Sequence, residues 1–217
     1  MRKAIKAAEA AGLIPDGASL MIGGFLAVGT PDRIIDALVA RGAHGLTVIT
    51  NDTARPGIGI GKLIDAGCVA RIVASHIGTN PVTQRRMLAG EIEVELVPQG
   101  TLAERIRAGG AGLGGVLTPT GVGTVVAEGK QVIAVNGREY LLEMPLRADF
   151  ALIRAHEADH FFNLTYRLTA ANFNPIMALA ATHVIAEPDK IVPLGVIPPD
   201  AVRTSGALVH HLVERRR

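Results

Sequence analysis

Short apolar runs alternate along the first half of the chain with longer segments whose apolar positions recur at helical spacing. The runs are rich in Val, Ile and Leu, which is typical of parallel strands covered on both faces. They predict strands at 20–22, 46–50, 69–74 and 94–97. The intervening segments predict helices at 2–11, 31–40, 62–66, 81–89 and from 101 to about 109. This order favours a parallel sheet flanked by helices.

Three helix starts carry recognisable capping residues. Thr30 precedes Pro31 and is predicted to cap the helix whose first residue is that proline. Asn80 stands in the same relation to the helix that begins at Pro81. The spacing from Thr101 to Glu104 predicts a capping box at the start of the next helix.

The pattern changes after residue 109. Residues 109–123 are rich in glycine and predict a long loop, and Asn136-Gly137 between 131–135 and 138–142 predicts a β-hairpin with a type I′ turn. Strands at 150–153 and 183–186, a helix at 174–181 and a last short element at 208–213 follow. The fold class predicted for residues 1–217 is a single α/β domain, an open and mainly parallel sheet flanked by helices, with a β-hairpin excursion.

Composition narrows the range of functions. The 217 residues carry a net charge of +2 and 3% aromatic residues, which argues against nucleic-acid binding and gives no reason to expect attraction to an anionic membrane. No apolar run approaches the ~20 residues of a membrane helix. The single cysteine, Cys68, is expected to be a small buried apolar residue, and no secretion signal is visible, so a cytoplasmic location is expected.

Two groups of residues are candidates for ligand binding because they follow predicted strands. Gly23, Gly24 and Gly29 lie between a strand and a helix, where open α/β sheets bind ligands. Asn51 and Gln99 follow the strands at 46–50 and 94–97. Their amides can donate to a carbonyl or hold a carboxylate without adding charge, and strand-end turn caps are the structural alternative.

Several segments together resemble one family. They are Gly23-Gly24-Phe25, Asn51-Asp52, 75–81, 90–102, 107–112, 118–124 and Ala171-Asn172-Phe173-Asn174-Pro175. In order and over nearly the whole chain, they resemble the alpha (A) subunit of family I coenzyme A transferases of the acetate, acetoacetate or 3-oxoacid type.

The resemblance implies ping-pong transfer of coenzyme A between an acyl-CoA and a short-chain acid or 3-oxoacid. It implies that Gln99 contacts the thioester carbonyl, that Asn51 lies in the acyl pocket, and that Gly23, Gly24, Phe25 and Gly29 shape the pocket loop. It implies no metal and no permanently bound cofactor, with the CoA thioester as substrate. The family nucleophile is a glutamate in a Ser-Glu-Asn-Gly-like setting on a separate beta subunit, in an assembly expected to be α2β2. No such string occurs here.

Three other interpretations remain at this stage. A sugar-phosphate isomerase or effector-binding domain of the same fold would need Lys or Arg beside the glycine loop, which 23–29 does not contain. His156-Glu157-Ala158-Asp159-His160 matches the zinc-hydrolase motif, but 150–153 before it predicts a strand, whereas the motif requires a helix. The glycines at 110–115 match a dinucleotide motif but follow a helix where a strand is required.

Overall fold

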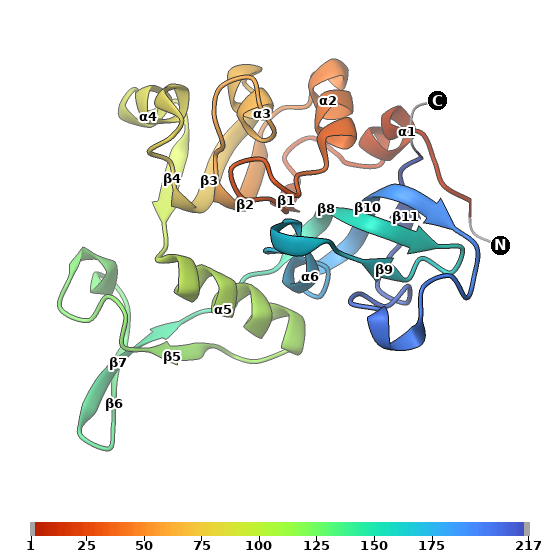
Figure 1. Ribbon diagram of the computed structural model, residues 1–217. Helices are drawn as coiled ribbons and strands as arrows, with labels where there is room; N and C mark the ends of the chain where they lie inside the picture. Colours follow the sequence, from red (N-terminus) through yellow and green to blue (C-terminus); the bar gives the residue numbers. More distant parts are fainter. Residues whose placement is uncertain (1–2, 215–217) are drawn as a thin grey trace.

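A computed structural model describes residues 3–214, and its centre is a sheet of eight strands with the order β11-β10-β8-β1-β2-β3-β4 and β9 paired to β8 (Figure 1). All pairings along this order are parallel, and only β9 runs antiparallel to its neighbour. The strands are β1 (Ser19–Ile22), β2 (Leu46–Asp52), β3 (Val69–His76), β4 (Glu93–Leu96), β8 (Ala148–Asp159), β9 (Leu164–Thr165), β10 (Ala181–Val192) and β11 (His211–Leu212). The open, mainly parallel sheet is confirmed.

Helices cover both faces of this sheet (Figure 1). One core lies under α1, α2 and α3 and contains Leu20, Ile35, Leu38, Leu63 and the buried Cys68. The other lies under α5 and α6 and is built around residues such as Met21, Ile106 and Met177. The helices are α1 (Ala7–Gly12), α2 (Asp32–Arg41), α3 (Gly61–Asp65), α4 (Pro81–Leu88), α5 (Gln99–Ala111) and α6 (Asn174–Met177), with 3-10 turns η1 (Val125–Ala127), η2 (Leu168–Ala170) and η3 (Pro199–Ala201).

The strand order reverses direction at β1. From β1 the chain adds β2, β3 and β4 on one side, whereas β8, β10 and β11 lie on the other side. In open α/β sheets the crevice at such a switch point, beyond the carboxyl ends of the strands, is where ligands bind. Residues 23–29 leave β1 at this point, so the topology itself places the glycine loop over the crevice.

A three-stranded antiparallel sheet projects from the main body beside α5 (Figure 1). It consists of β5 (Val116–Thr118), β6 (Val132–Val135) and β7 (Arg138–Glu143), in the order β5-β7-β6. The predicted hairpin is confirmed, with positive φ at Asn136 and Gly137. Arg105 of α5 holds the base of this arm, because its guanidinium donates to Met144 O at 2.8 Å. That residues 1–217 form one domain remains a prediction.

Several predicted boundaries are wrong. The helix predicted at 2–11 begins only at Ala7, because Ile5 forms a parallel bridge with Val213 beside the sheet; Arg2 lies outside the described residues. The predicted loop at 109–123 contains the end of α5 and all of β5. The helix predicted at 174–181 ends at Met177, and the strands predicted at 150–153 and 183–186 are far longer, because β8 and β10 pair along their whole length.

Of the three predicted caps, one is confirmed. Asn80 Oδ1 accepts from the backbone N–H groups of Val82 and Thr83. Thr30 does not cap α2, because its buried side chain lies against Gly24 and Pro31 takes the capping position.

The capping box at Thr101 is also wrong. Helix α5 begins at Gln99, two residues earlier, and Glu104 pairs with Arg107 at 2.6 Å instead of reaching back to the helix start.

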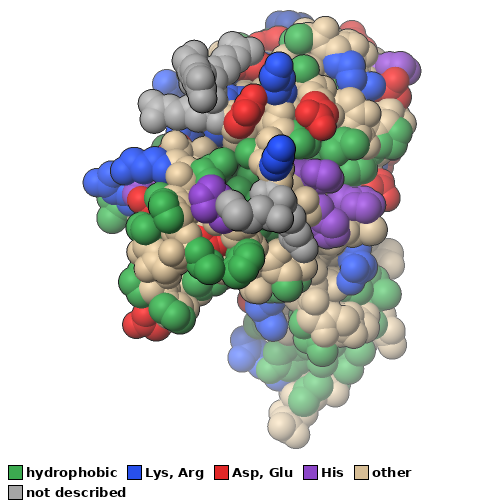
Figure 2. Space-filling view, turned by 90° about the vertical axis from the view of Figure 1, so that its right-hand side faces the viewer, with side chains coloured by type: hydrophobic (Ala, Val, Ile, Leu, Met, Phe, Trp, Pro, Cys, Tyr) green, Lys and Arg blue, Asp and Glu red, His purple; other side chains and the backbone are tan. Residues whose placement is uncertain are grey.

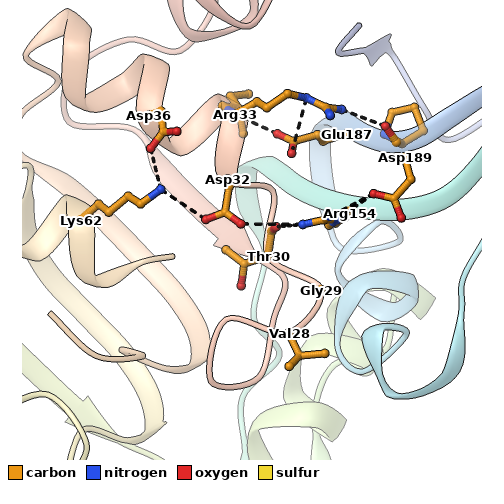
Figure 3. Close-up of polar contacts among 12 residues, drawn as sticks. Val28, Gly29, Thr30, Asp32, Arg33, Asp36, Lys62, Arg154, Glu187 and Asp189 are labelled. Carbon is orange, nitrogen blue, oxygen red and sulfur yellow. Dashed lines mark hydrogen bonds and ion pairs between the residues drawn. The ribbon is translucent and has the colours of Figure 1, made fainter. Parts of the chain in front are cut away.

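Ion pairs tie the start of α2 to residues within β8 and β10 (Figure 3). Arg154 lies 2.8 Å from Asp189 Oδ1 and 3.7 Å from Asp32 Oδ2, and it donates to Thr30 O at 3.4 Å. Because Thr30 ends the glycine loop, this arginine joins the loop to two strands of the sheet.

A buried carboxylate continues the same network (Figure 3). Glu187 of β10 accepts from Ile34 N at 3.1 Å and lies 3.6 Å from Arg33 Nε. Burial raises the pKa of the Glu187 carboxyl, although the charge of Arg33 and the hydrogen bond from Ile34 oppose the shift.

No helix formed by residues 3–214 combines the length and the apolar character needed to cross a membrane.

The raised pKa of Glu187 predicts a pH-dependent contribution to stability. A carboxyl with a higher pKa in the folded state stabilises the fold fully below its unfolded pKa of about 4.3, and this contribution is lost as the pH rises through the folded pKa. We therefore expect Glu187→Gln, which cannot titrate, to gain stability relative to wild type as the pH rises from about 4 through the raised pKa of Glu187. Urea unfolding at several pH values measures the difference, with the exposed Glu9→Gln as control. A difference that stays constant with pH would contradict this.

Candidate functional site

The tip of the glycine loop is a tight two-residue turn. Phe25 and Val28 exchange both backbone hydrogen bonds, at 3.0 and 2.9 Å, and the two residues between them, Leu26 and Ala27, have φ values of 46° and 71°. Left-handed backbone costs a non-glycine residue roughly 1–2 kcal/mol. Such a turn persists only where surrounding contacts hold it.

Asp52, the last residue of β2, holds the turn through hydrogen bonds to backbone N–H groups. Its Oδ2 accepts from Leu26 N at 2.9 Å and its Oδ1 accepts from Ala54 N at 2.8 Å. The side chain is buried, with 3% of the residue exposed. The carboxylate therefore binds the end of one strand to the loop that leaves its neighbour.

Two asparagines hold the same loop from the other side. Asn172 accepts from Gly24 N at 3.1 Å and donates to Val28 O at 2.9 Å. Asn174, fully buried, donates to Gly29 O at 3.0 Å and accepts from Arg154 N at 3.0 Å. Buried amides that satisfy backbone groups in this way specify one loop conformation.

The three loop glycines are required by these contacts. A Cβ on Gly23 would collide with the Asn174 side chain, and one on Gly24 would collide with Thr30 Oγ1. A Cβ on Gly29 would lie 2.5 Å from Ala170 O. All three glycines are buried. Their place after a strand predicts close approach to a ligand, whereas the close neighbours in the structure are the chain's own residues.

Asn51 and Gln99 are brought together at the pocket. Gln99, the first residue of α5, donates from Nε2 to Asn51 Oδ1 at 2.7 Å, and Asn51 donates from Nδ2 to Asp52 Oδ2 at 2.7 Å. Ser75 Oγ lies 2.8 Å from Asn51 O and 3.1 Å from Asn51 Oδ1. Asn51 is almost wholly buried, while Gln99 is exposed. Strand β2 thus supplies two members of a hydrogen-bonded series of polar side chains, and strand β3 and helix α5 supply one each.

These hydrogen-bonded polar side chains form one wall of an open pocket of about 390 Å³ at the carboxyl ends of β2 and β3. Its lining combines amide and hydroxyl groups with two apolar side chains of the loop tip, and contains no Lys or Arg. The Lys or Arg side chains with which a sugar-phosphate isomerase or effector-binding domain would bind a phosphate are therefore missing from this lining. The lining residues are Phe25, Leu26, Asn51, Asp52, Ser75, His76, Thr79 and Gln99.

The zinc-motif residues lie elsewhere and have the wrong geometry. His156 belongs to strand β8 and His160 follows its end, so about 13 Å of extended chain separates them. His156 instead lies 3.6 Å from Asp189. No three His, Cys, Asp or Glu side chains converge as metal ligands anywhere in residues 3–214. The strand predicted at 150–153, directly before this motif, is confirmed, and β8 continues through His156.

Other histidines gather on the face that includes the β10–β11 edge (Figure 2). The His183 and His210 rings lie 5.1 Å apart, and His183 packs on Phe150 at 5.3 Å. His210 Nδ1 accepts a hydrogen bond from the backbone N–H of Val184 at 3.0 Å, so this ring nitrogen is occupied by the backbone of β10.

Sequence reasoning missed the residues that hold the site. In the sequence, Asp52 stands out only as the neighbour of Asn51, and Asn172 and Asn174 only as parts of the segment 171–175. The available signal was the placement of three short polar side chains directly after strands or before a short helix, where they satisfy loop backbone groups. Leu26 and Ala27 gave no turn signal, because glycine or asparagine is expected at such positions.

Fold and pocket together define an open α/β protein with its candidate site beside the topological switch point, between the loop after β1 and the carboxyl ends of β2 and β3. The family model described as Coenzyme A transferase matches residues 4–215. The chain therefore belongs to the coenzyme A transferase family, and its curated relatives are alpha or A subunits.

Two relatives and one solved structure illustrate the similarity. Acetate CoA-transferase subunit alpha of Escherichia coli (strain K12) is 57% identical over 94% of this chain and 93% of that one. The acetoacetyl-CoA:acetate/butyrate CoA transferase alpha subunit of Clostridium acetobutylicum is 51% identical over 92% and 91%. A crystal structure of acyl-CoA transferase YdiF from E. coli O157:H7 has the same fold, with a TM-score of 0.86 and 24% identity over 96% of this chain. This chain spans 46% of that protein's length.

The close packing around the loop glycines gives a stability prediction. We expect Gly23→Ala to lower the free energy of unfolding by about 1–3 kcal/mol, because its Cβ must displace the buried Asn174 amide. Gly12→Ala is the matched control, since a Cβ there meets nothing within 4 Å. The control should be neutral or should stabilise the chain by about 0.4–1 kcal/mol. Denaturant unfolding compares the two, and equal effects would contradict the proposed packing role.

Proposed function

We propose that this chain is the alpha-type half of an enzyme that moves coenzyme A between an acyl-CoA and a short-chain acid or 3-oxoacid. The observation that carries the proposal is the Gln99 amide, fixed by Asn51 at the rim of an open pocket that has no free reactive acid. Family membership supplies the reaction class, and the pocket supplies the roles of individual residues.

Gln99 is the proposed donor to the thioester carbonyl. A primary amide nitrogen carries two hydrogens, and among the contacts within residues 3–214 one of these is used, on Asn51 Oδ1. The second is available to an oxygen in the pocket. A donor aimed at the oxyanion that develops during attack lowers the barrier by about 3 kcal/mol.

Asn51 and the loop tip are proposed to position the acyl group. The Asn51 side chain is held by Asp52, Ser75 and Gln99, so its place in the pocket wall is fixed. Phe25 adds an apolar surface at the mouth, and the packed glycines Gly23, Gly24 and Gly29 fix its position.

The nucleophile is proposed to be a glutamate of a beta-type partner. Its carboxylate oxygen attacks the thioester carbonyl carbon, the CoA thiolate leaves, and a mixed anhydride forms. The thiolate then attacks the glutamyl carbonyl and releases the first acid as a carboxylate. The resulting glutamyl-CoA thioester reacts with the second acid by the same steps in reverse, with no net proton change. Covalent catalysis of this kind divides one difficult transfer into easier ones.

Two observations support the need for a partner. The only carboxylate in the pocket lining, Asp52, is buried and already accepts three hydrogen bonds. Large apolar side chains are also exposed at the rim, where Phe25 and Val28 have 44% and 50% of their surface accessible. An apolar rim around an open pocket is typical of a surface that another protein covers.

The substrates are proposed from the names of relatives. Those names include acetate, acetoacetyl-CoA:acetate/butyrate, 3-oxoadipate and succinyl-CoA:3-ketoacid CoA-transferases. The shared chemistry is a small carboxylate and its CoA thioester, with no permanently bound cofactor. We propose an α2β2 assembly working in the cytoplasm, and the single buried cysteine is compatible with that compartment.

Removal of the Gln99 donor should slow the chemical step. In the assembled enzyme we expect Gln99→Ala to reduce kcat by about 10²- to 10³-fold with a much smaller change in KM. Gln84→Ala, whose amide donates to Gly78 O outside the pocket lining, is the matched control and should keep kcat. Steady-state transfer between acetoacetyl-CoA and acetate measures both variants. Unchanged kcat in Gln99→Ala would contradict the assigned role.

The need for a second chain is tested by reconstitution. We expect no CoA transfer by this chain alone, and transfer when it is co-purified with a chain that carries a Ser-Glu-Asn-Gly-type string. Transfer by the purified single chain at a comparable rate would overturn the two-chain proposal.

A further inference from the structure

We infer that Asp52 is a positioning residue that sets the direction of the hydrogen bonds from Gln99 through Asn51, and so decides which group of Gln99 faces the pocket. This inference rests on the proposed function of Gln99. It adds a residue to which no catalytic part has been assigned so far.

The Asp52 carboxylate determines the orientation of the Asn51 amide. An ionised carboxylate only accepts hydrogen bonds, whereas a side-chain amide both donates and accepts. Asp52 Oδ2 lies 2.7 Å from Asn51 Nδ2, so Asn51 must turn its NH2 group toward Asp52. The Asn51 oxygen is then forced to face the other way, toward Gln99 and Ser75.

The next link follows by the same rule. Asn51 Oδ1 is an acceptor, so the group of Gln99 that lies 2.7 Å from it must be the Nε2 donor. If Asn51 were turned over, its NH2 group would face Gln99, and Gln99 would present its oxygen there. The side-chain amide of Gln99 is exposed and would otherwise be free to turn. The orientation of the hydrogen-bonded series Gln99–Asn51–Asp52, called the relay below, is therefore set at its buried end, Asp52.

The carboxylate is itself held in place. Backbone N–H groups of Leu26 and Ala54 donate to its two oxygens, at 2.9 and 2.8 Å, and neither can reverse its direction. Asp52 thus receives three donors on a side chain that is 3% exposed. The hydrogen bond from Leu26 N to Asp52 also links the relay to the loop tip. Asp52 therefore holds both the Gln99 donor and the apolar loop tip of Phe25 and Leu26 in place.

A double-mutant cycle in the assembled enzyme separates positioning from general support. Asp52→Asn keeps the shape but offers one acceptor oxygen where the carboxylate offers two, and it no longer forces the direction of Asn51. We expect kcat to fall by about tenfold in the wild-type background and by less than about twofold in the Gln99→Ala background, because the two changes act on one donor. Asp65→Asn is the control, since its carboxylate accepts from Gly57 N away from the pocket and kcat should not change.

Equal losses in the two backgrounds would overturn the inference, because Asp52 would then act only through the loop. An unchanged kcat in Asp52→Asn would overturn it as well. A wild-type assembly with no CoA transfer would instead overturn the proposed function, and with it the catalytic part of this inference.

A second measurement uses the wild-type chain alone, without the partner and without any substitution. In the 15N-labelled full chain, the side-chain NH2 hydrogens of Asn51 should exchange with solvent at least about tenfold more slowly than those of an exposed amide such as Gln131, since one is held by Asp52 and the group is buried. Exchange of the Asn51 hydrogens at the rate of Gln131 would overturn the relay itself, whatever the outcome of the kinetic cycle.

Discussion

The strained turn at the tip of the glycine loop is the constraint on which the site depends. Leu26 and Ala27 adopt left-handed backbone that they do not favour, and hydrogen bonds from both sides hold them there. Asp52 reaches the turn from β2, and Asn172 reaches it from the segment before α6. Because these anchors come from opposite sides of β1, the loop can take this shape only when the switch point of the sheet is assembled.

The same constraint explains why small residues follow β1. Gly23, Gly24 and Gly29 are needed because the anchoring side chains press directly against the loop backbone. Arg154 and its carboxylate partners fix the far end of the loop at Thr30 (Figure 3). Site geometry in this protein is thus a product of polar contacts buried between loop and sheet, and the pocket surface itself carries few charges.

Local patterns were sufficient to predict much of the fold. The apolar runs of β1 to β4, the Asn80 cap and the Asn136-Gly137 hairpin each depend on neighbours in the sequence, and each is confirmed. The lengths of β8 and β10 could not be predicted, because the paired register that extends them joins strands about thirty residues apart and polar residues such as His156 interrupt the apolar pattern. The predicted Thr30 cap is wrong because the burial of this side chain against Gly24 depends on the tertiary fold.

The candidate site was predictable only where its signal lay in the local sequence. Strand-end positions pointed to Asn51 and Gln99, and the structure brings them together, although their catalytic roles remain proposals. The anchors Asp52, Asn172 and Asn174 could not be recognised, because their partners are loop backbone groups up to about 150 residues away. Leu26 and Ala27 could not be recognised either, since their backbone conformation contradicts their own preferences.

The most direct test of the account is to locate the covalent intermediate. The assembled enzyme would be incubated with an acyl-CoA in the absence of a second acid, and both chains digested and examined by mass spectrometry for attached coenzyme A. The account requires the CoA thioester on a glutamate of the partner chain, with this chain unmodified. Coenzyme A attached to a carboxylate of this chain, Asp52 included, would contradict it.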